Sequence, residues 1–171
     1  MIKKIIITLI GVIVVLFVAF FCIGAAVPSV EYTTTVEINK PRDVTWRVLR
    51  ERKDWIYGFK NIEQISGAPD QVGSRARITV VRDGSEFTFD SELKQMRPPE
   101  MAETELKNDM LVHDAVVNLS ENDGKTTIVS NEKITGTNLL YRSLFAIFKS
   151  RITATSTKNF DGLKQVVESE N

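Results

Sequence analysis

Residues 138–169 read NLLYRSLFAIFKSRITATSTKNFDGLKQVVES, and this stretch decides the fold. Its apolar residues recur at three- and four-residue steps, which is the pattern of one face of an amphipathic helix. With Asn138 as the N-cap, the pattern predicts one helix of about 45 Å that needs a wide apolar surface to lie on. The stripe consists of Leu140, Leu144, Phe148, Ile152, Thr155, Ser156, Phe160, Leu163 and Val167.

The middle of this stripe is not apolar. Residues 153–157 read TATST, so every side chain there is small. Small side chains at the centre of a helix predict room between that helix and the surface on which it lies. A cavity is therefore expected beneath the middle of the terminal helix.

The composition argues against several classes of function. The chain has 171 residues, 43% of them hydrophobic, and a formal net charge of zero, so one domain and no nucleic-acid partner are expected. Its one cysteine, Cys22, lies in an apolar N-terminal stretch, and His113 is its one histidine. We therefore expect no disulfide, no thiolate catalysis, no metal site and no cofactor.

The apolar stretch Ile5–Val27 carries no charge and follows Lys3 and Lys4. About 20 apolar residues are enough to cross a bilayer, so residues 1–29 are predicted to be a single-pass membrane anchor and residues 30–171 one domain. A cleaved signal peptide is the alternative, but the stretch exceeds the roughly 7–15 apolar residues of such signals. The flanking lysines predict a cytoplasmic N-terminus and an extracytoplasmic domain.

The next part of the chain, residues 30–135, shows mostly the two-residue alternation of strands. A first strand is predicted at Glu31–Asn39, and Pro41 is suited to begin a helix. A second short helix or a turn is expected at Asp54–Phe59, followed by a strand at Ile62–Ile65. Strands then continue to the start of the terminal helix.

Turns set the register of a continuous curved sheet from Arg75 to Thr135. Two-residue hairpin turns are predicted at Asp83-Gly84 and Asp123-Gly124, a tight turn at Asn108-Asp109, and an even-length loop around Pro98-Pro99. A slip of one residue would reverse the face of every side chain, yet all four turns agree on one inner face. The predicted pairs are Arg82–Ser85, Val80–Phe87, Ile78–Phe89, Ala76–Ser91, Leu106–Leu111, Thr104–His113, Asn122–Lys125, Leu119–Ile128, Val117–Ser130, Ala115–Glu132 and His113–Ile134.

The inner face combines apolar and polar side chains, whereas the outer face collects charged ones. Together with residues of the terminal helix, the inner face is predicted to bind a ligand. The predicted ligand-binding residues are Ile78, Val80, Phe87, Phe89, Ser91, Leu93, Thr104, Leu106, His113, Val117, Ser130, Glu132, Phe148, Ile152, Thr155 and Ser156.

His113 and Glu132 are diagonal neighbours in this register, about 7 Å apart at Cα, a distance that long side chains can close. A carboxylate would orient the imidazole and favour its charged form. The pair is a candidate general acid and base, or a group that positions the polar end of a ligand. The alternative is a hydrogen-bonded core histidine beside a carboxylate at the rim.

Residues 36–49, VEINKPRDVTWRVL, resemble the opening of START-like (SRPBCC, polyketide cyclase and lipid-transport) domains. The resemblance covers about residues 32–168, although Lys40 stands where the family usually has alanine. It implies an α+β helix-grip fold, in which a seven-stranded antiparallel sheet folds about the C-terminal helix with an apolar cavity between them. It implies no particular reaction, because one fold hosts many activities. Other similar features are Asp54-Trp55, Gly67, Gly73-Ser74 and LKQVVE at residues 163–168.

The function expected from these observations is membrane-anchored binding, and possible transport, of a hydrophobic small molecule or lipid in the cavity. An enzyme that uses His113 and Glu132 for acid-base chemistry is one alternative. A membrane-tethered interaction domain with a closed core is the other, and it would use the charged outer face or the aromatic residues of 55–59. The size and lining of the space beneath the terminal helix separate these readings.

Overall fold

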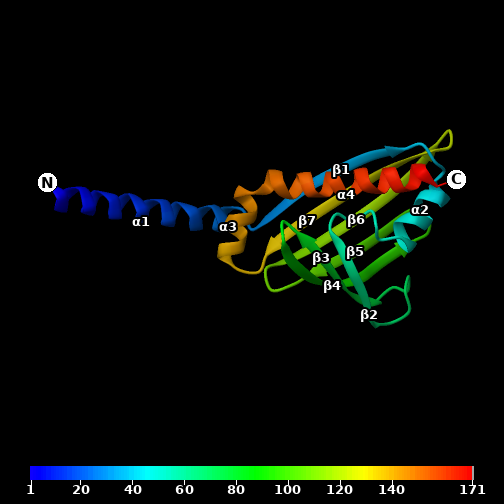
Figure 1. Ribbon diagram of the computed structural model, residues 1–171, viewed down its shortest axis with the longest axis horizontal. Coiled ribbons are helices and arrows are strands. Elements are labelled where there is room, and N and C mark those ends of the chain that lie inside the picture. The colour runs from blue at the N-terminus through cyan, green and yellow to red at the C-terminus, as the bar shows by residue number, and fades with distance from the viewer. Residues whose placement is uncertain (171) are drawn as a thin grey trace.

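The computed structural model describes residues 1–170 and begins with a long helix that stands apart from the rest of the chain (Figure 1). This helix, α1, is long and apolar enough to cross a membrane. Seven strands and three further helices follow, which is the predicted α+β composition. The elements are α1 (Ile2–Ala26), β1 (Ser29–Ile38), α2 (Arg42–Glu51), β2 (Phe59–Ser66), β3 (Arg75–Arg82), β4 (Ser85–Arg97), β5 (Met101–Lys107), β6 (Leu111–Asn122), β7 (Lys125–Gly136), α3 (Leu139–Ile147) and α4 (Lys149–Ser169).

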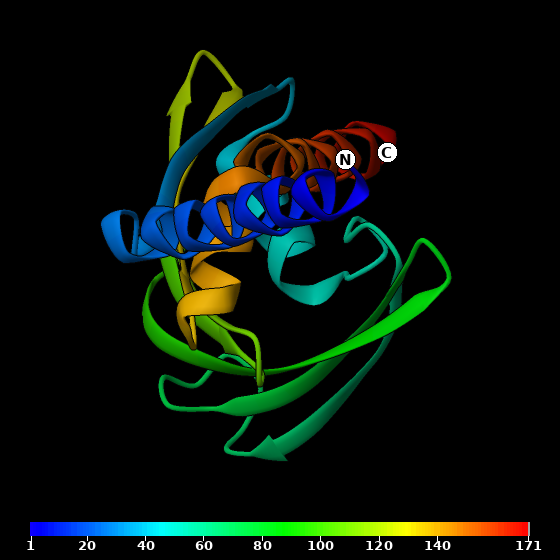
Figure 2. The same cartoon turned by 90° about the vertical axis from the view of Figure 1, so that its left-hand side faces the viewer.

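All seven strands belong to one antiparallel sheet with the order β1-β7-β6-β5-β4-β3-β2. Viewed from the α1 end, the sheet curves from β1 round to β2, and α2 and α4 lie on its concave side (Figure 2). The helices pack mainly on one part of the sheet, with α4 on β1, α3 on β1 and β7, and α2 on β6 and β7. The predicted arrangement of a curved sheet around the C-terminal helix is confirmed.

The two hairpin turns predicted from Asp-Gly pairs are both present. All four residues have positive φ, at 50° for Asp83, 77° for Gly84, 49° for Asp123 and 71° for Gly124. Positive φ at both central residues is what a type I′ turn requires, and it matches the twist of the flanking strands. The pairs predicted from these two turns, including Ile78–Phe89 and His113–Ile134, are confirmed.

The turn between β5 and β6 is wider than predicted. Leu106 pairs with His113 and not with Leu111, and Thr104 pairs with Ala115 and not with His113. The reason is that the Asn108 side-chain oxygen accepts hydrogen bonds from the backbone N–H groups of residues 110 and 111, which enlarges the turn. The shift is two residues, so the predicted face is retained.

The loop between β4 and β5 encloses three residues, 98–100, because Arg97 pairs with Met101. The predicted even-length loop is therefore wrong. A β-bulge between Leu93 and Gln95 inserts one further residue in β4 and restores the alternation. Two one-residue irregularities thus cancel, and Leu93 still lies on the same face as Thr104.

The single terminal helix predicted for Asn138–Ser169 is wrong, because the chain forms two helices. Phe148 leaves helical geometry with φ −94° and ψ 19°, and α4 begins after it. Asn138 does cap the N-terminus, since its side-chain oxygen accepts from the Tyr141 N–H at 3.1 Å. The break lets α3 change direction, so that it lies against the end of α1 as well as against β1 and β7 (Figure 1).

A close contact explains the direction of α3. A Cβ added at Gly24 of α1 would lie 2.4 Å from the Ser143 Oγ and 2.6 Å from the Leu139 carbonyl oxygen of α3. Glycine therefore allows the two helix backbones to approach, as small residues do where helices cross closely. Ser143 is fully buried in this contact and donates its hydroxyl hydrogen to Leu139.

The main core lies where α2 and the second half of α4 meet β1, β6 and β7. Its most buried side chains are Ile38, Ile128, Leu163 and Val167, each 0% exposed. The connection between α2 and β2, predicted as a second short helix or a turn, is a turn, and its Trp55 stacks on Phe160 of α4 at 6.4 Å between ring centroids. This core holds one end of α4 in place and leaves the other end near α3.

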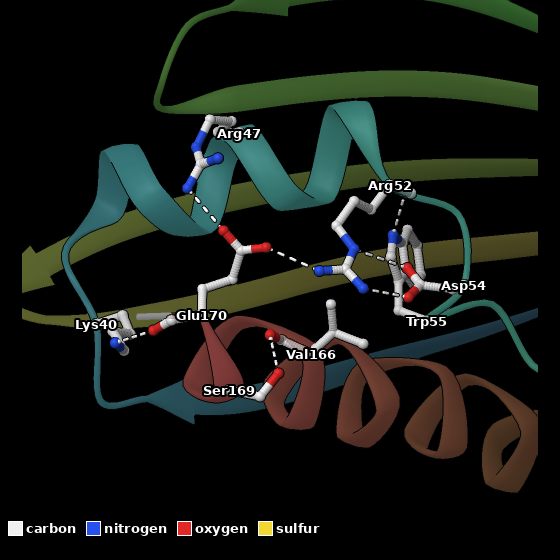
Figure 3. A network of polar contacts seen from close by, with 8 residues as sticks. All are labelled: Lys40, Arg47, Arg52, Asp54, Trp55, Val166, Ser169 and Glu170. Carbon is white, nitrogen blue, oxygen red and sulfur yellow. Dashed lines mark hydrogen bonds and ion pairs between the residues drawn. The ribbon is translucent and has the colours of Figure 1, made fainter.

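Ion pairs fix the C-terminal end of α4 to α2 (Figure 3). The Glu170 carboxylate accepts hydrogen bonds from Arg47 and Arg52, each at 2.8 Å, and Arg52 also pairs with Asp54. These groups are at least partly exposed, so each pair contributes little to stability by itself. Their effect is to fix a position, because they hold the last turn of α4 against the end of α2.

Candidate functional site

The concave face of β3–β6 is only partly covered. Its inward side chains alternate with the charged ones of the outer face, and most of them are only half-buried. The helices pack mainly on β1, β6 and β7, so the rest of the inner surface of β3–β6 is open. We call this open part the concave face. Half-buried members are Ile78, Phe87, Phe89, Ser91, Thr104, Leu106, His113 and Val117, whereas Val80 and Leu93 are buried, as are Ser130 and Glu132 on the adjoining inner side of β7.

The helical residues predicted to bind a ligand lie in different places. Ser156 is buried against the sheet, and Ile152 and Thr155 are half-buried on the first turns of α4. Phe148 is 46% exposed at the junction of α3 and α4. The structure thus brings the twelve sheet residues onto one face and only part of the helical set next to it.

Two hollows of about 380 and 400 Å³ lie outside the expected place. The first is on the outer face of β1, β6 and β7, and the second lies beside the first turns of α1. At Ser156 the small residues of α4 leave no gap, because its hydroxyl reaches both Thr34 and Glu132. The small side chains therefore allow a close approach of α4 to β1, and the open part of the concave face lies further along the sheet.

Glu132 is the centre of a buried hydrogen-bond network on this face. The residue is 8% exposed. Its Oε2 accepts from the Tyr32 hydroxyl at 2.9 Å and from the His113 Nε2 at 3.0 Å. Its Oε1 accepts from the Ser130 hydroxyl at 3.2 Å and from the Ser156 hydroxyl. Two donors thus reach each carboxylate oxygen.

Strand pairing and α4 position these donors. Tyr32 of β1 lies directly opposite Glu132 of β7, and His113 of β6 is its diagonal neighbour, as predicted. Ser156 comes from α4, and its Oγ is 2.9 Å from the Thr34 Oγ1. Because the one hydroxyl hydrogen of Ser156 is directed at Glu132, Thr34 donates in the second bond. Four elements therefore meet at this carboxylate.

The network determines the protonation of its members. Burial alone would raise the pKa of Glu132, but hydrogen bonds from His113, Ser156 and Tyr32 outweigh it and hold this pKa below its usual value. Burial, followed by the charge of Glu132, raises the pKa of Tyr32 well above its usual value. Glu132 is therefore ionised at neutral pH, and Tyr32 remains a protonated donor.

His113 is the network member that can contact a ligand. Its Nε2 carries a hydrogen, because this atom donates to an ionised carboxylate. The Nδ1 of His113 makes no hydrogen bond within residues 1–170. This atom is not buried without a partner, because the side chain is 18% exposed. Glu132, in contrast, has its oxygens occupied. Glu132 therefore orients His113, and the Nδ1 of His113 is free to interact with a bound molecule.

Sequence reasoning missed Tyr32 and Thr34 as parts of this site. The alternation within residues 31–39 already places Tyr32 and Thr34 on the face of Ile38. That signal does not give the partner strand, because Tyr32 and Glu132 are 100 residues apart. The pairing of β1 with β7 was the missing step.

No protein-family model and no curated protein matches the sequence. Solved structures do match its fold. The Zhui aromatase/cyclase from Streptomyces sp. R1128 superposes with a TM-score of 0.69 at 13% identity, over 82% of this chain and 94% of that one. TTHA0849 from Thermus thermophilus gives 0.67 at 12% identity, over 81% and 97%. Ara h 8.0201 gives 0.65 at 12% identity, over 83% and 99%.

At such low identities the likeness shows the fold alone. The matches extend over nearly the whole of each of these three structures and leave roughly the length of α1 outside. Both the seven-stranded antiparallel sheet and the C-terminal helix agree with the predicted resemblance. The chain has the helix-grip fold of START-like domains.

Proposed function

We propose that this protein binds a hydrophobic small molecule or lipid on its concave face while α1 tethers it to a membrane. The observation that carries the proposal is the open apolar surface that includes Phe87 and Phe89. Both aromatic side chains face inward on β4, yet neither is fully buried. Exposed apolar surface of this kind marks a binding site more often than a stable free surface.

The polar network supports a ligand with an apolar body. Binding sites for small molecules are mainly apolar and contain a few polar groups that fix the orientation of the ligand. His113 supplies such a group, because its Nδ1 is unoccupied and its ring is held by Glu132. A domain with a closed core, which would favour an interaction function, is less well supported because the concave face is open.

An enzyme is the second candidate, and His113 is the specific observation in its favour. An imidazole held at Nε2 by a buried carboxylate and free at Nδ1 has the arrangement of a general base. The Zhui protein, which has the same fold, is an aromatase/cyclase, and that is a statement about the Zhui protein. Here His113 would take a proton from a bound apolar substrate, and Glu132 would stabilise the resulting imidazolium.

We expect a bulky residue on the concave face to displace the ligand. Thr104 lies half-buried on β5, directly opposite Leu93, so Thr104→Trp should fill this surface and remove most of the ligand that co-purifies with the full chain. The measurement is mass spectrometry of organic extracts from the detergent-purified protein. Thr88→Trp is the matched control, because Thr88 is exposed on the outer face of β4.

Three outcomes of this extraction experiment are informative. A species enriched in the wild type and in Thr88→Trp but depleted in Thr104→Trp supports binding. Chemical conversion of that species on incubation, lost in His113→Gln, would instead support the enzyme. No species enriched above an unrelated single-pass membrane protein would contradict both.

The tether is supported by α1 and by the surface of α3. The end of α1 packs on α3 through Gly24, and large apolar side chains of α3 and its C-cap remain exposed. We propose that α3 lies in the bilayer interface beside the anchor, with the N-terminus cytoplasmic and the domain extracytoplasmic. The exposed side chains are Leu139 at 40%, Leu140 at 44%, Ile147 at 47% and Phe148 at 46%.

A depth probe on α3 tests this placement. In the full chain with Cys22→Ala, an environment-sensitive fluorophore on Phe148→Cys should be quenched by vesicle lipids that carry a nitroxide near the headgroup. The same fluorophore on Val72→Cys should not be quenched, because Val72 belongs to the connection between β2 and β3, which lies away from α1 (Figure 1). Equal quenching at both sites would contradict the placement of α3, and release of the chain by alkaline carbonate would contradict the tether.

A further inference from the structure

Arg82 is a cation on the concave side of the sheet. It is the last residue of β3, two positions after the buried Val80, and therefore shares its face. The residue is half-buried, and its Nε lies 3.5 Å from the Tyr57 carbonyl oxygen. Its guanidinium carbon is 6.0 Å from the centre of the Tyr57 ring. These contacts direct the guanidinium towards Tyr57, in the connection between α2 and β2.

The guanidinium of Arg82 has no carboxylate partner within residues 1–170. Some other arginines of the domain do have one, since Arg50 reaches Asp70 at 2.5 Å and Arg77 reaches Asp90 at 3.0 Å. Burial of a cation without such a partner is costly, and burial lowers the pKa of Arg82. An arginine side chain remains charged in proteins even so. The concave face thus holds an uncompensated positive charge.

A second cation strengthens the positive potential near Arg82. The Lys158 Nζ of α4 lies 3.3 Å from the centre of the same Tyr57 ring. Tyr57 is itself held to α4, because its backbone N–H donates to the Asn159 side-chain oxygen at 2.8 Å. The carboxylate of Glu132 makes no ion pair with Arg82 within residues 1–170, because its oxygens bond to Tyr32, His113, Ser130 and Ser156. Two cations therefore flank one ring between β3 and α4.

Apolar surface begins directly beside this charge. Arg82 pairs with Ser85, and Phe87 is the diagonal neighbour of Arg82 on the same face. Phe89 is the next residue of β4 on that face. A guanidinium offers paired N–H donors that match the oxygens of a carboxylate or a phosphate. A charge next to an aromatic surface is the pattern expected for an amphiphile, whose head is anionic and whose chain is apolar.

We propose that Arg82 binds the anionic head of an amphiphile, a carboxylate or a phosphate, while its apolar chain lies along Phe87 and Phe89. This inference rests on the proposed function and adds the chemical class of the ligand. His113 lies further along the same face, in the row that contains Leu106 and Ser91. A hydroxyl or carbonyl group within the chain of the ligand would reach its Nδ1.

Photoaffinity labelling of the full chain in phosphatidylcholine nanodiscs tests this proposal. Three probes carry the same diazirine-bearing alkyl chain and end in a carboxylate, a phosphate or an alcohol. The readout is the fraction of β3–β4 peptide labelled, measured by mass spectrometry, and labelling of α1 reports delivery of each probe to the bilayer. We expect an anionic probe to label β3–β4 more strongly than the alcohol, and comparison of the two anions identifies the preferred head.

Arg82→Gln should reduce β3–β4 labelling by the preferred anionic probe about tenfold or more, because a charged hydrogen bond is lost. Labelling by the alcohol should not change. Arg75→Gln is the control, since Arg75 lies on the outer side of the same strand. Thermal unfolding of each variant shows whether a loss of labelling reflects a loss of fold.

Two different failures are distinguishable in this experiment. Equal labelling of β3–β4 by all three probes, or anionic labelling unchanged in Arg82→Gln, overturns the head-group assignment and leaves hydrophobic binding intact. Labelling of α1 without labelling of β3–β4 by any probe overturns the proposed function itself. Reduced labelling by the alcohol in Arg82→Gln would show that Arg82 shapes the surface without recognising charge.

Discussion

Replacing Glu132 with alanine is expected to lower the free energy of unfolding by about 3 kcal/mol, near the lower end for removing one partner of a buried charged pair. The substitution leaves the donors of Tyr32, Ser130 and Ser156 without their acceptor, and each buried unpaired group is costly. His113 is 18% exposed and can turn to water, which keeps the loss at the lower end.

Urea unfolding of the full chain in detergent micelles, followed by tryptophan fluorescence, measures this loss. Glu37→Ala is the matched control, because Glu37 is exposed on the outer face of β1, and it should change stability by less than about 0.5 kcal/mol. Equal effects of the two substitutions would show that the Glu132 network does not hold α4 to the sheet.

The same carboxylate predicts a pH dependence. The pKa of Glu132 in the folded state lies below its usual value of 4.5, so the unfolded chain binds more protons between these two pKa values. Stability therefore rises with pH in this window, and the contribution of Glu132 is present above about pH 4.5 and lost as the pH falls through the lower, folded-state pKa. Glu132→Gln should lose less stability than the wild type over this acid range. Parallel pH profiles of the two proteins would contradict the assignment.

The second large effect is expected in the main core. Leu163 is 0% exposed between α4 and the sheet, and Leu163→Ala should lower the free energy of unfolding by about 2–5 kcal/mol, through lost apolar burial and the cavity that remains. The same urea titration measures it.

Val72→Ala provides the comparison for Leu163→Ala. Val72 is 55% exposed in the connection between β2 and β3, so its truncation should cost less than about 0.5 kcal/mol. A loss below about 1 kcal/mol for Leu163→Ala would show that the end of α4 is loosely packed and that the ion pairs of Glu170 carry more of its attachment.

The sequence was informative wherever a feature depends on neighbours along the chain. Each Asp-Gly turn fixes its own hairpin, so the partners of Val80 and Leu119 were predictable. The inner face was predicted correctly despite two wrong details between β4 and β6. A register shift moves a side chain to the other face only when the shift is an odd number of residues. The diagonal approach of His113 to Glu132 followed from the same reasoning and is confirmed as a contact.

The sequence was uninformative wherever a feature depends on distant elements. The periodicity of residues 138–169 is continuous across Phe148, and nothing local indicates that α3 must turn towards α1. Small residues on α4 predicted a gap, but Ser156 meets Thr34, which is 122 residues away. Small size is compatible with both a void and a close approach, and only the partner strand decides between them. Whether the predicted ligand-binding residues bind a ligand stays a prediction.

The connection from α1 to the domain is short, and its α1 end packs against α3. Only two residues separate Ala26 from Ser29, and Gly24 is locked against Ser143. With α1 in a bilayer, the domain cannot swing on a flexible stalk or travel to a distant compartment. A bound ligand would have to exchange with the membrane leaflet directly beneath the domain, or be transferred to a soluble acceptor that binds to the domain. Such a protein would load or release its ligand at a fixed place in the membrane, and another carrier would transport the ligand further.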